Sequence, residues 1–176
     1  MIRYTSETSD CFVYTKKEGI LSPVAHDLKL RVARFSILVN PDTFEIVANF
    51  DPGSLEVVCA MDGGLEKDRA LRRWECKEIE RNVRGSVLKV SRFSELSFRS
   101  TNVEKKEGNY YIVGSLKLFK ETKTITTVTR LIGDRMIANV EINQPDFGIK
   151  PFRALLAPLL KVAPIVKVVL SVPIEL

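Results

Sequence analysis

The sequence contains a single histidine and none of the short motifs that organise common active sites. GxSxG, HExxH, the phosphate-binding P-loop and GxGxxG are all missing. A catalytic nucleophile, a metal-bound water or a nucleotide cofactor would therefore have no recognisable partner residues. His26 has no second histidine with which to share a metal ion. We predict a protein without catalytic residues, without a catalytic cofactor and without a metal site.

Cysteine and long apolar runs are also scarce. Cys11, Cys59 and Cys76 are odd in number and lack CxxC spacing, which argues against a disulfide framework and favours a reducing compartment. The N-terminal letters MIRYTSETSDCFVY lack the apolar core of a secretory signal. No stretch approaches the ~18 uninterrupted apolar residues of a membrane helix. We expect a cytoplasmic protein with neither a signal peptide nor a transmembrane segment.

The net charge of +5 is modest, and basic residues are mixed with acidic ones. The densest basic stretch, EKDRALRRWECKEIERNVR, also carries several acids and lacks the interleaved aromatic residues of a single-strand binder. An exposed helix explains the same residues. We therefore expect no nucleic-acid partner.

Alternation of apolar and polar residues dominates the remaining sequence. A chain of 176 residues with 45% apolar residues is long enough for one domain, residues 1–176, with its own core. Period-two segments separated by turn residues predict antiparallel strands and a mainly β fold. About eight strands of this length can close into a barrel, although a β-sandwich fits the same periodicity. The expected strands are residues 10–15, 24–39 with a bend near Ala33, 43–50 in a hairpin, 54–58 continuing it, 95–101, 109–119, 122–132, 135–142 and 165–176.

One segment, residues 65–89, is rich in helix formers and predicts a helical insertion. Its apolar residues change phase, which predicts a break between residues 74 and 77. Trp74 is expected to pack this helical pair onto the sheet rather than to stack on a ligand.

A second short helical or irregular segment is predicted near residues 150–160. Pro151 can begin a helical turn there, and apolar residues follow at helical spacing. This segment would either form a flap over the barrel mouth or plug one end. The nearby basic side chains would suit an anionic membrane surface; they are Lys150, Arg153, Lys161 and Lys167.

The side chains expected on the inner face of the sheet are almost wholly apolar. They can fill a core or, in a wider barrel, line a cavity for a long hydrocarbon. Gly114, Ala48, Ala138 and Thr127 are small and in phase with larger residues, so they leave room either for a ligand or for neighbouring side chains.

Four segments resemble the YceI-like family of lipid-binding proteins. AHDLKLRVARF (25–35) matches a histidine and phenylalanine region, and VLKVSRFSELSFRSTNV (87–103) matches the end of the family's helical insertion. YYIVGSLKLFKETKTITTVTRL (110–131) resembles a hairpin of the family, and EINQPDFGI (141–149) resembles its i.rsdfGi signature. Departures near 33–34, 94 and 120–121, together with the absent signal sequence, would make this a divergent member.

The resemblance implies a lipocalin-like barrel that binds, and carries or stores, a long apolar ligand. The ligand would be a polyisoprenoid, an isoprenoid quinone, a fatty acid or a fatty amide. A homodimer and a peripheral membrane contact also follow as expectations. A filled barrel serving as an interaction module is the alternative, and a lipid-modifying enzyme is a weaker one. The expected ligand-binding residues are His26, Leu28, Leu30, Phe35, Phe44, Ile46, Phe98, Tyr110, Ile112, Leu116, Met136, Phe147, Phe152, Leu156, Val168 and Leu170.

His26 is in phase with the apolar residues of its strand, so its side chain is expected to face inward. It is either a core histidine bonded to a polar neighbour or a contact for a ligand head group, and the sequence leaves both interpretations open.

Overall fold

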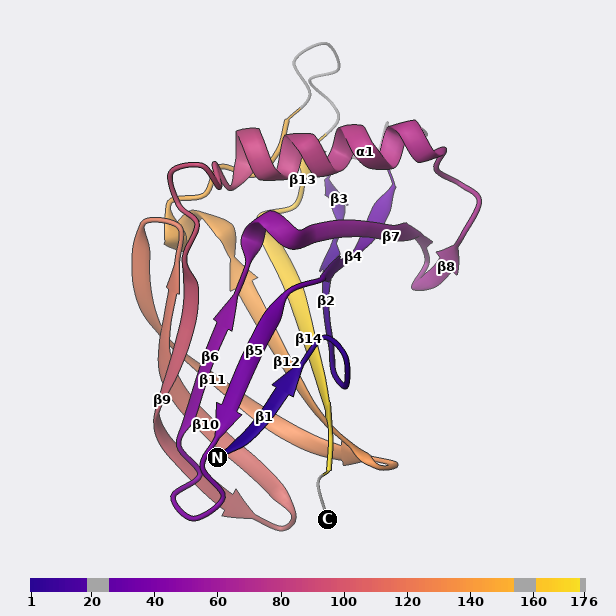
Figure 1. Cartoon of the computed structure of the whole chain (residues 1–176). Coiled ribbons are helices and arrows are strands. Elements are labelled where there is room, and N and C mark those ends of the chain that lie inside the picture. Colours follow the sequence, from indigo (N-terminus) through magenta and orange to yellow (C-terminus); the bar gives the residue numbers. More distant parts are fainter. Residues whose placement is uncertain (19–25, 154–160, 175–176) are drawn as a thin grey trace.

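The chain folds into a strongly curled antiparallel sheet crossed at one end by a helix (Figure 1). This computed structural model describes residues 1–18, 26–153 and 161–174. The strands of the main sheet are β1 (Ile2–Thr5), β2 (Asp10–Thr15), β4 (Asp27–Val32), β5 (Phe35–Val39), β6 (Ile46–Phe50), β7 (Leu55–Asp62), β8 (Leu65–Lys67), β9 (Leu96–Lys106), β10 (Asn109–Leu118), β11 (Glu121–Ile132), β12 (Arg135–Asn143) and β14 (Ile165–Pro173). A separate pair is formed by β3 (Lys17–Glu18) and β13 (Lys161–Val162).

The order of the strands corrects the predicted closed barrel of eight strands. Twelve strands pair in the order β1-β5-β6-β9-β10-β11-β12-β14-β2-β4-β7-β8. Within the described ranges, β1 and β8 are the two ends of this order and do not pair with each other. The mainly β prediction is confirmed, but the sheet curls into a half-barrel.

The predicted strand of residues 24–39 is two strands that join at a sharp corner. β4 pairs with β2 and β7, whereas β5 pairs with β1 and β6. At the corner, the Arg34 N–H donates to Ser54 Oγ at 2.9 Å, and the Arg34 guanidinium binds Asp51 at 2.6 Å. Ser54 belongs to the 3₁₀ turn η1 (Pro52–Ser54) that leads into β7. Consequently β7 pairs with β4, and the prediction that residues 54–58 continue the hairpin of 43–50 is wrong.

The run from β9 to β12 confirms the predicted meander. Each of these strands is the neighbour of the next in the sheet. The hairpin of β5 and β6 is also confirmed, with Phe35 opposite Phe50 and Val39 opposite Ile46. Local alternation and turn residues are sufficient to predict that such strands pair, because the chain reverses directly from one strand into the next.

The helical insertion is shorter and less interrupted than predicted. α1 (Arg73–Asn82) runs directly into the π-helical turn η2 (Val83–Val87), and β8 occupies the beginning of the predicted helical segment. The expected break at residues 74–77 lies inside α1 and is wrong. The change of phase instead separates two faces, because Trp74 is exposed while Ile79 is half-buried. No helix in the described part of the chain is long and apolar enough to cross a membrane.

The end of the sheet away from α1 is filled by side chains. Its buried residues include Tyr4, Cys11, Ile37 and Ala48. The space left by Gly114 is occupied by the ring of Phe98, which would collide with any Cβ at position 114. The small residue at this position therefore makes room for a neighbouring side chain, which was one of the two predicted alternatives.

The QPDFGI motif turns the chain at the end of β12. Residues Gln144–Phe147 form the 3₁₀ turn η3, and Gly148 follows with a φ of 75°, a conformation that glycine adopts readily. Phe147 and Ile149 are both buried in a hydrophobic cluster that also contains Leu116, Leu118 and Phe119. Beyond it, Arg153 forms an isolated bridge with Lys161. The predicted flap of residues 150–160 lies mostly outside the described residues.

Candidate ligand-binding cavity

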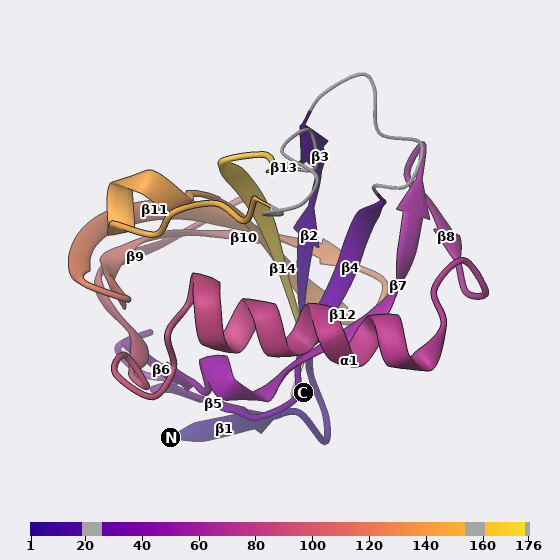
Figure 2. The same cartoon turned by 90° about the horizontal axis from the view of Figure 1, so that it is seen from above.

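A cavity of about 270 Å³ lies beneath the helix, between α1 with η2 and the inner face of the curled sheet. Figure 2, which looks down on α1, shows the helix lying across the end of the sheet. β2, β4 and β14 supply a large part of the sheet side of this cavity, namely Val13, Leu28, Leu30, Val32, Val166 and Val168. Other strands of the sheet add further apolar lining residues, which are Phe50, Leu55, Leu96, Leu118 and Ile142.

The underside of the helix supplies the opposite wall. Ile79, Val83 and Val87 recur four residues apart, so they lie on one face of the helix, and all three line the cavity. Leu71 and Leu88 extend this wall at its two ends. The cavity is therefore bounded by branched aliphatic groups on both sides, which is the lining expected for an apolar ligand.

A buried carboxylate attaches the helix to the sheet. Glu80 is 4% exposed and accepts hydrogen bonds from the Val57 N–H at 3.1 Å and from Lys77 Nζ at 2.8 Å. Arg84 lies 3.7 Å from the same carboxylate and donates to the Leu55 carbonyl oxygen at 2.7 Å. Burial alone would raise the pKa of Glu80, but the hydrogen bonds from Lys77 and Val57 hold this pKa below its ordinary value. The charged form of Glu80 thus holds α1 over the cavity.

Polar side chains also occur among the lining residues. Thr15, Lys17, Asn82, Gln144 and Lys161 each contribute to the lining. Lys17 and Lys161 come from the paired strands β3 and β13. Such groups can meet the polar end of a ligand whose chain lies against the aliphatic wall.

His26 is half-buried and lines two adjoining spaces. One is the apolar cavity and the other is an open pocket that includes Met61, Glu66 and Asp68. The imidazole therefore lies where the apolar interior meets a polar surface. This position is compatible with contact to a head group, and that role stays a prediction.

One cluster beside this pocket has donor atoms that a metal ion can use. Atoms of Cys59, Glu66 and Asp68 lie within 4.8 Å of one another. However, Lys29 Nζ already pairs with Glu66 at 2.5 Å, and burial raises the pKa of the Cys59 thiol. A metal ion needs a deprotonated thiol and would compete with the ammonium group of Lys29 for Glu66. The cluster therefore fits a structural Lys29–Glu66 ion pair better than a cation site.

Only some of the predicted ligand-binding residues line the cavity. His26, Leu28, Leu30, Phe152 and Val168 line the cavity. Leu156 lies outside the described residues, and the roles of the whole set stay predictions. The remaining residues lie elsewhere in the protein; they are Phe35, Phe44, Ile46, Phe98, Tyr110, Ile112, Leu116, Met136, Phe147 and Leu170.

The helical wall was not among the predicted ligand-binding residues. Ile79, Val83 and Val87 were recognisable as one apolar helical face, but their spacing does not show which part of the sheet they cover. Phe50 and Leu55 are also part of the lining. They come from strands on either side of η1, and only the corner near Ser54 brings them together.

Comparison with known proteins agrees with this architecture. The YceI-like domain model matches residues 26–174. Among solved structures, BcnA from Burkholderia cenocepacia is similar, with a TM-score of 0.63, 15% identity, and coverage of 95% of this chain and 96% of that one. The YCEI protein of Campylobacter jejuni gives a TM-score of 0.51, 13% identity, and coverage of 75% and 77%. No curated protein was found to match in sequence.

Family members are generally non-enzymatic binding proteins associated with polyisoprenoid binding. The domain match spans most of the chain, and the structural likenesses share its fold. The protein therefore belongs to the YceI-like family.

Proposed function

We propose that this protein binds the hydrocarbon chain of a lipid in the cavity beneath α1 and carries or stores it. The observation that carries the proposal is the cavity itself, whose sheet and helix walls are both aliphatic. A cavity with apolar walls holds water poorly, so an apolar chain gains free energy by entering it.

The size of the cavity suggests how much of a ligand it takes. A methylene group fills about the volume of a water molecule, ~30 Å³, so 270 Å³ corresponds to roughly nine such groups. At ~0.8 kcal/mol for each buried methylene, their transfer amounts to about 7 kcal/mol, which before ordering costs corresponds to a Kd on the order of 10 μM. A chain of this length belongs to a short isoprenoid, a fatty acid or one end of a longer polyisoprenoid.

A cavity-narrowing variant tests this proposal. Val168→Phe places a ring in the cavity, whereas Val58→Phe makes the same substitution on β7 at a side chain that is 44% exposed. We expect Val168→Phe to weaken binding of the fluorescent fatty acid cis-parinaric acid about tenfold or more, because the ring excludes several methylenes. Val58→Phe should bind like the unaltered protein, and farnesol should displace the probe from both the unaltered protein and Val58→Phe.

A lack of any ligand binding would favour the alternative of a filled barrel that serves as an interaction module. If the unaltered protein binds neither probe, and organic extraction of the purified protein releases no lipid, the proposal is wrong. Equal binding by Val168→Phe and Val58→Phe would place the ligand outside this cavity.

A further inference from the structure

The outer face of α1 carries an exposed tryptophan, contrary to the prediction that this ring packs on the sheet. Trp74 is 58% exposed, although it lies one turn from residues that line the cavity. Lys77 and Arg81 follow it at helical spacing and are also exposed. α1 therefore has two different faces, one turned toward the cavity and the other toward solvent.

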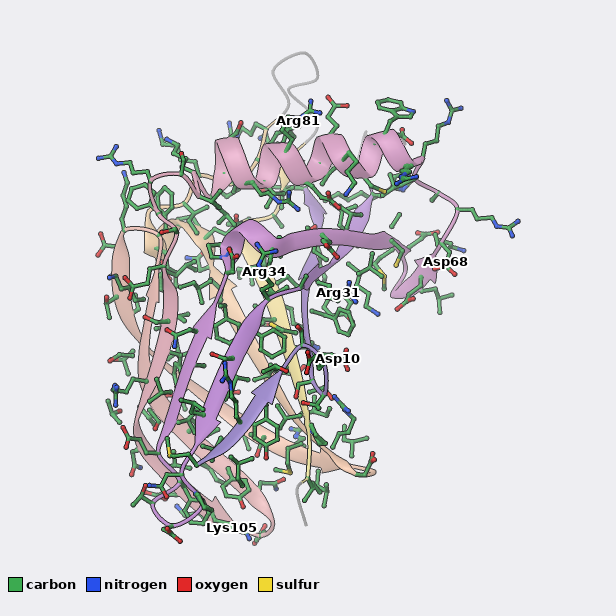
Figure 3. All side chains as sticks on the ribbon, viewed as in Figure 1. Asp10, Arg31, Arg34, Asp68, Arg81 and Lys105 are labelled. Atoms are coloured by element: carbon green, nitrogen blue, oxygen red, sulfur yellow. The ribbon has the colours of Figure 1, made fainter. Side chains whose placement is uncertain are left out.

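Several cations of the sheet are held in ion pairs, whereas others on the strands, such as Lys105 and Arg130, take part in none within the described residues. Arg31, Arg34 and Arg99 each pair with a carboxylate from a neighbouring part of the sheet. In the described part of the chain, no ion pair engages Arg73 or Arg81. Figure 3 shows Arg81 on the outer side of α1, at the opposite end of the molecule from Lys105.

The charge around Trp74 favours an anionic partner. In residues 68–82, exposed arginines outnumber exposed acids. The arginines are Arg69, Arg72, Arg73 and Arg81, and the acids are Asp68 and Glu78. An indole ring has an apolar body and a polar N–H, and it prefers the boundary between hydrocarbon and lipid head groups. Cations beside such a ring are attracted to anionic lipids.

We propose that the exposed side of α1, where Trp74 and Arg81 share one face and Arg73 is the exposed first residue of the helix, docks on the surface of an anionic lipid bilayer. Trp74 enters the head-group layer, and the two arginines contact lipid phosphates. Because the other face of α1 lines the cavity, this orientation places the covered end of the protein at the membrane. Docking does not require that the cavity hold a ligand, so it can be tested separately.

The single tryptophan supplies a direct test with the full-length protein. Vesicles of phosphatidylcholine alone are compared with vesicles of phosphatidylcholine mixed with phosphatidylglycerol. We expect the indole emission to shift to shorter wavelength, and the protein to float with the vesicles, only when phosphatidylglycerol is present. High salt should weaken the association, because it screens the attraction between exposed charges.

A matched pair of variants separates local charge from total charge. Arg73→Glu with Arg81→Glu should lower the vesicle-bound fraction at least about tenfold. Lys105→Glu with Arg130→Glu makes the same change of net charge, with Lys105 at the opposite end of the molecule and Arg130 near the far end of β11, and should leave binding within about twofold of the unaltered protein. Trp74→Ala, followed by flotation, should bind several-fold more weakly. Unchanged urea midpoints would show that the variants remain folded.

Several outcomes would overturn the proposal. They are equal binding to both kinds of vesicle, binding to neither, and equal losses from the two double variants. Binding to duplex DNA that depends on Arg73 and Arg81, without retention on vesicles, would assign this face to a nucleic acid instead. Failure of docking would leave the ligand experiment with cis-parinaric acid unaffected.

Discussion

The two ends of the curled sheet share strands such as β2 and β14 but differ in packing. On β14, Val166 and Val168 line the cavity, while Leu170 packs into the filled core further along the strand. On β2, Val13 lines the cavity and Cys11 is buried in the core. A single strand therefore passes from a hollow region into a filled one without changing its alternation.

The difference lies in what covers each end. In the filled end, Phe98 packs directly over Gly114, and buried Tyr4 and Ile37 occupy the remaining space. At the hollow end, Glu80 attaches α1 to β7, and aliphatic side chains of the helix and the sheet face each other across the cavity. We infer that the filled end supplies most of the stability and the hollow end supplies the binding surface.

The largest expected effect is the loss of a side chain from the filled end. Ile37 is 3% exposed, so Ile37→Ala should lower the free energy of unfolding by ~2 to 5 kcal/mol, because it leaves a void in a packed core. Ile79→Ala, beside the existing cavity, should cost about 1 kcal/mol, because fewer contacts are lost there. Urea unfolding measures both values, and similar losses would contradict the contrast between the two ends.

A methyl group at position 114 should also destabilise the filled end. Gly114→Ala pushes against the Phe98 ring and the Arg99 carbonyl oxygen, with an expected cost of ~1 to 3 kcal/mol. Gly85→Ala is the control, because Gly85 lies in a helical turn with open space around it and alanine favours helices. Its urea midpoint should stay the same or rise. Combining Gly114→Ala with Phe98→Leu should recover part of the loss.

Protonation of Glu80 should loosen the attachment of the helix at the hollow end. Its pKa is lower in the folded protein than in the unfolded chain, so its contribution to stability is present above the unfolded pKa and is lost as the pH falls through the folded pKa. Glu80→Gln should cost ~1 to 3 kcal/mol near neutral pH, and it should reduce the slope of stability against pH below about pH 5. Urea midpoints across this range measure the effect, and an unchanged slope would contradict the role of Glu80.

Thiol labelling should distinguish buried from accessible cysteines without changing stability. Burial raises the pKa of Cys11 to about 12, and Cys11 is 2% exposed in the filled end. Cys76 on α1 is only half-buried. Iodoacetamide should therefore modify Cys76 first in the folded protein, as peptide mass spectrometry can determine. Rapid labelling of Cys11 under native conditions would show that the filled end opens readily.

Local patterns in the sequence predicted the parts of the fold that depend on nearby residues. β2 occupies the predicted residues 10–15, and the meander from β9 to β12 follows the order of the sequence. β1 was not predicted, because its four residues are too few to establish alternation. The homodimer and the cytoplasmic location stay predictions, as do the roles of the individual ligand-binding residues.

The sequence by itself determined the strand alternation, the helical insertion and the apolar inner face, because each follows from side-chain spacing along one segment. Tertiary structure decided which inner residues fill a core and which line a cavity. Val168 and Leu170 have the same phase on β14, yet only Val168 borders the cavity, because Leu170 lies further along the strand and packs against the filled core. The tertiary structure also decided that Trp74 faces solvent, since the orientation of α1 depends on the contact between Glu80 and β7.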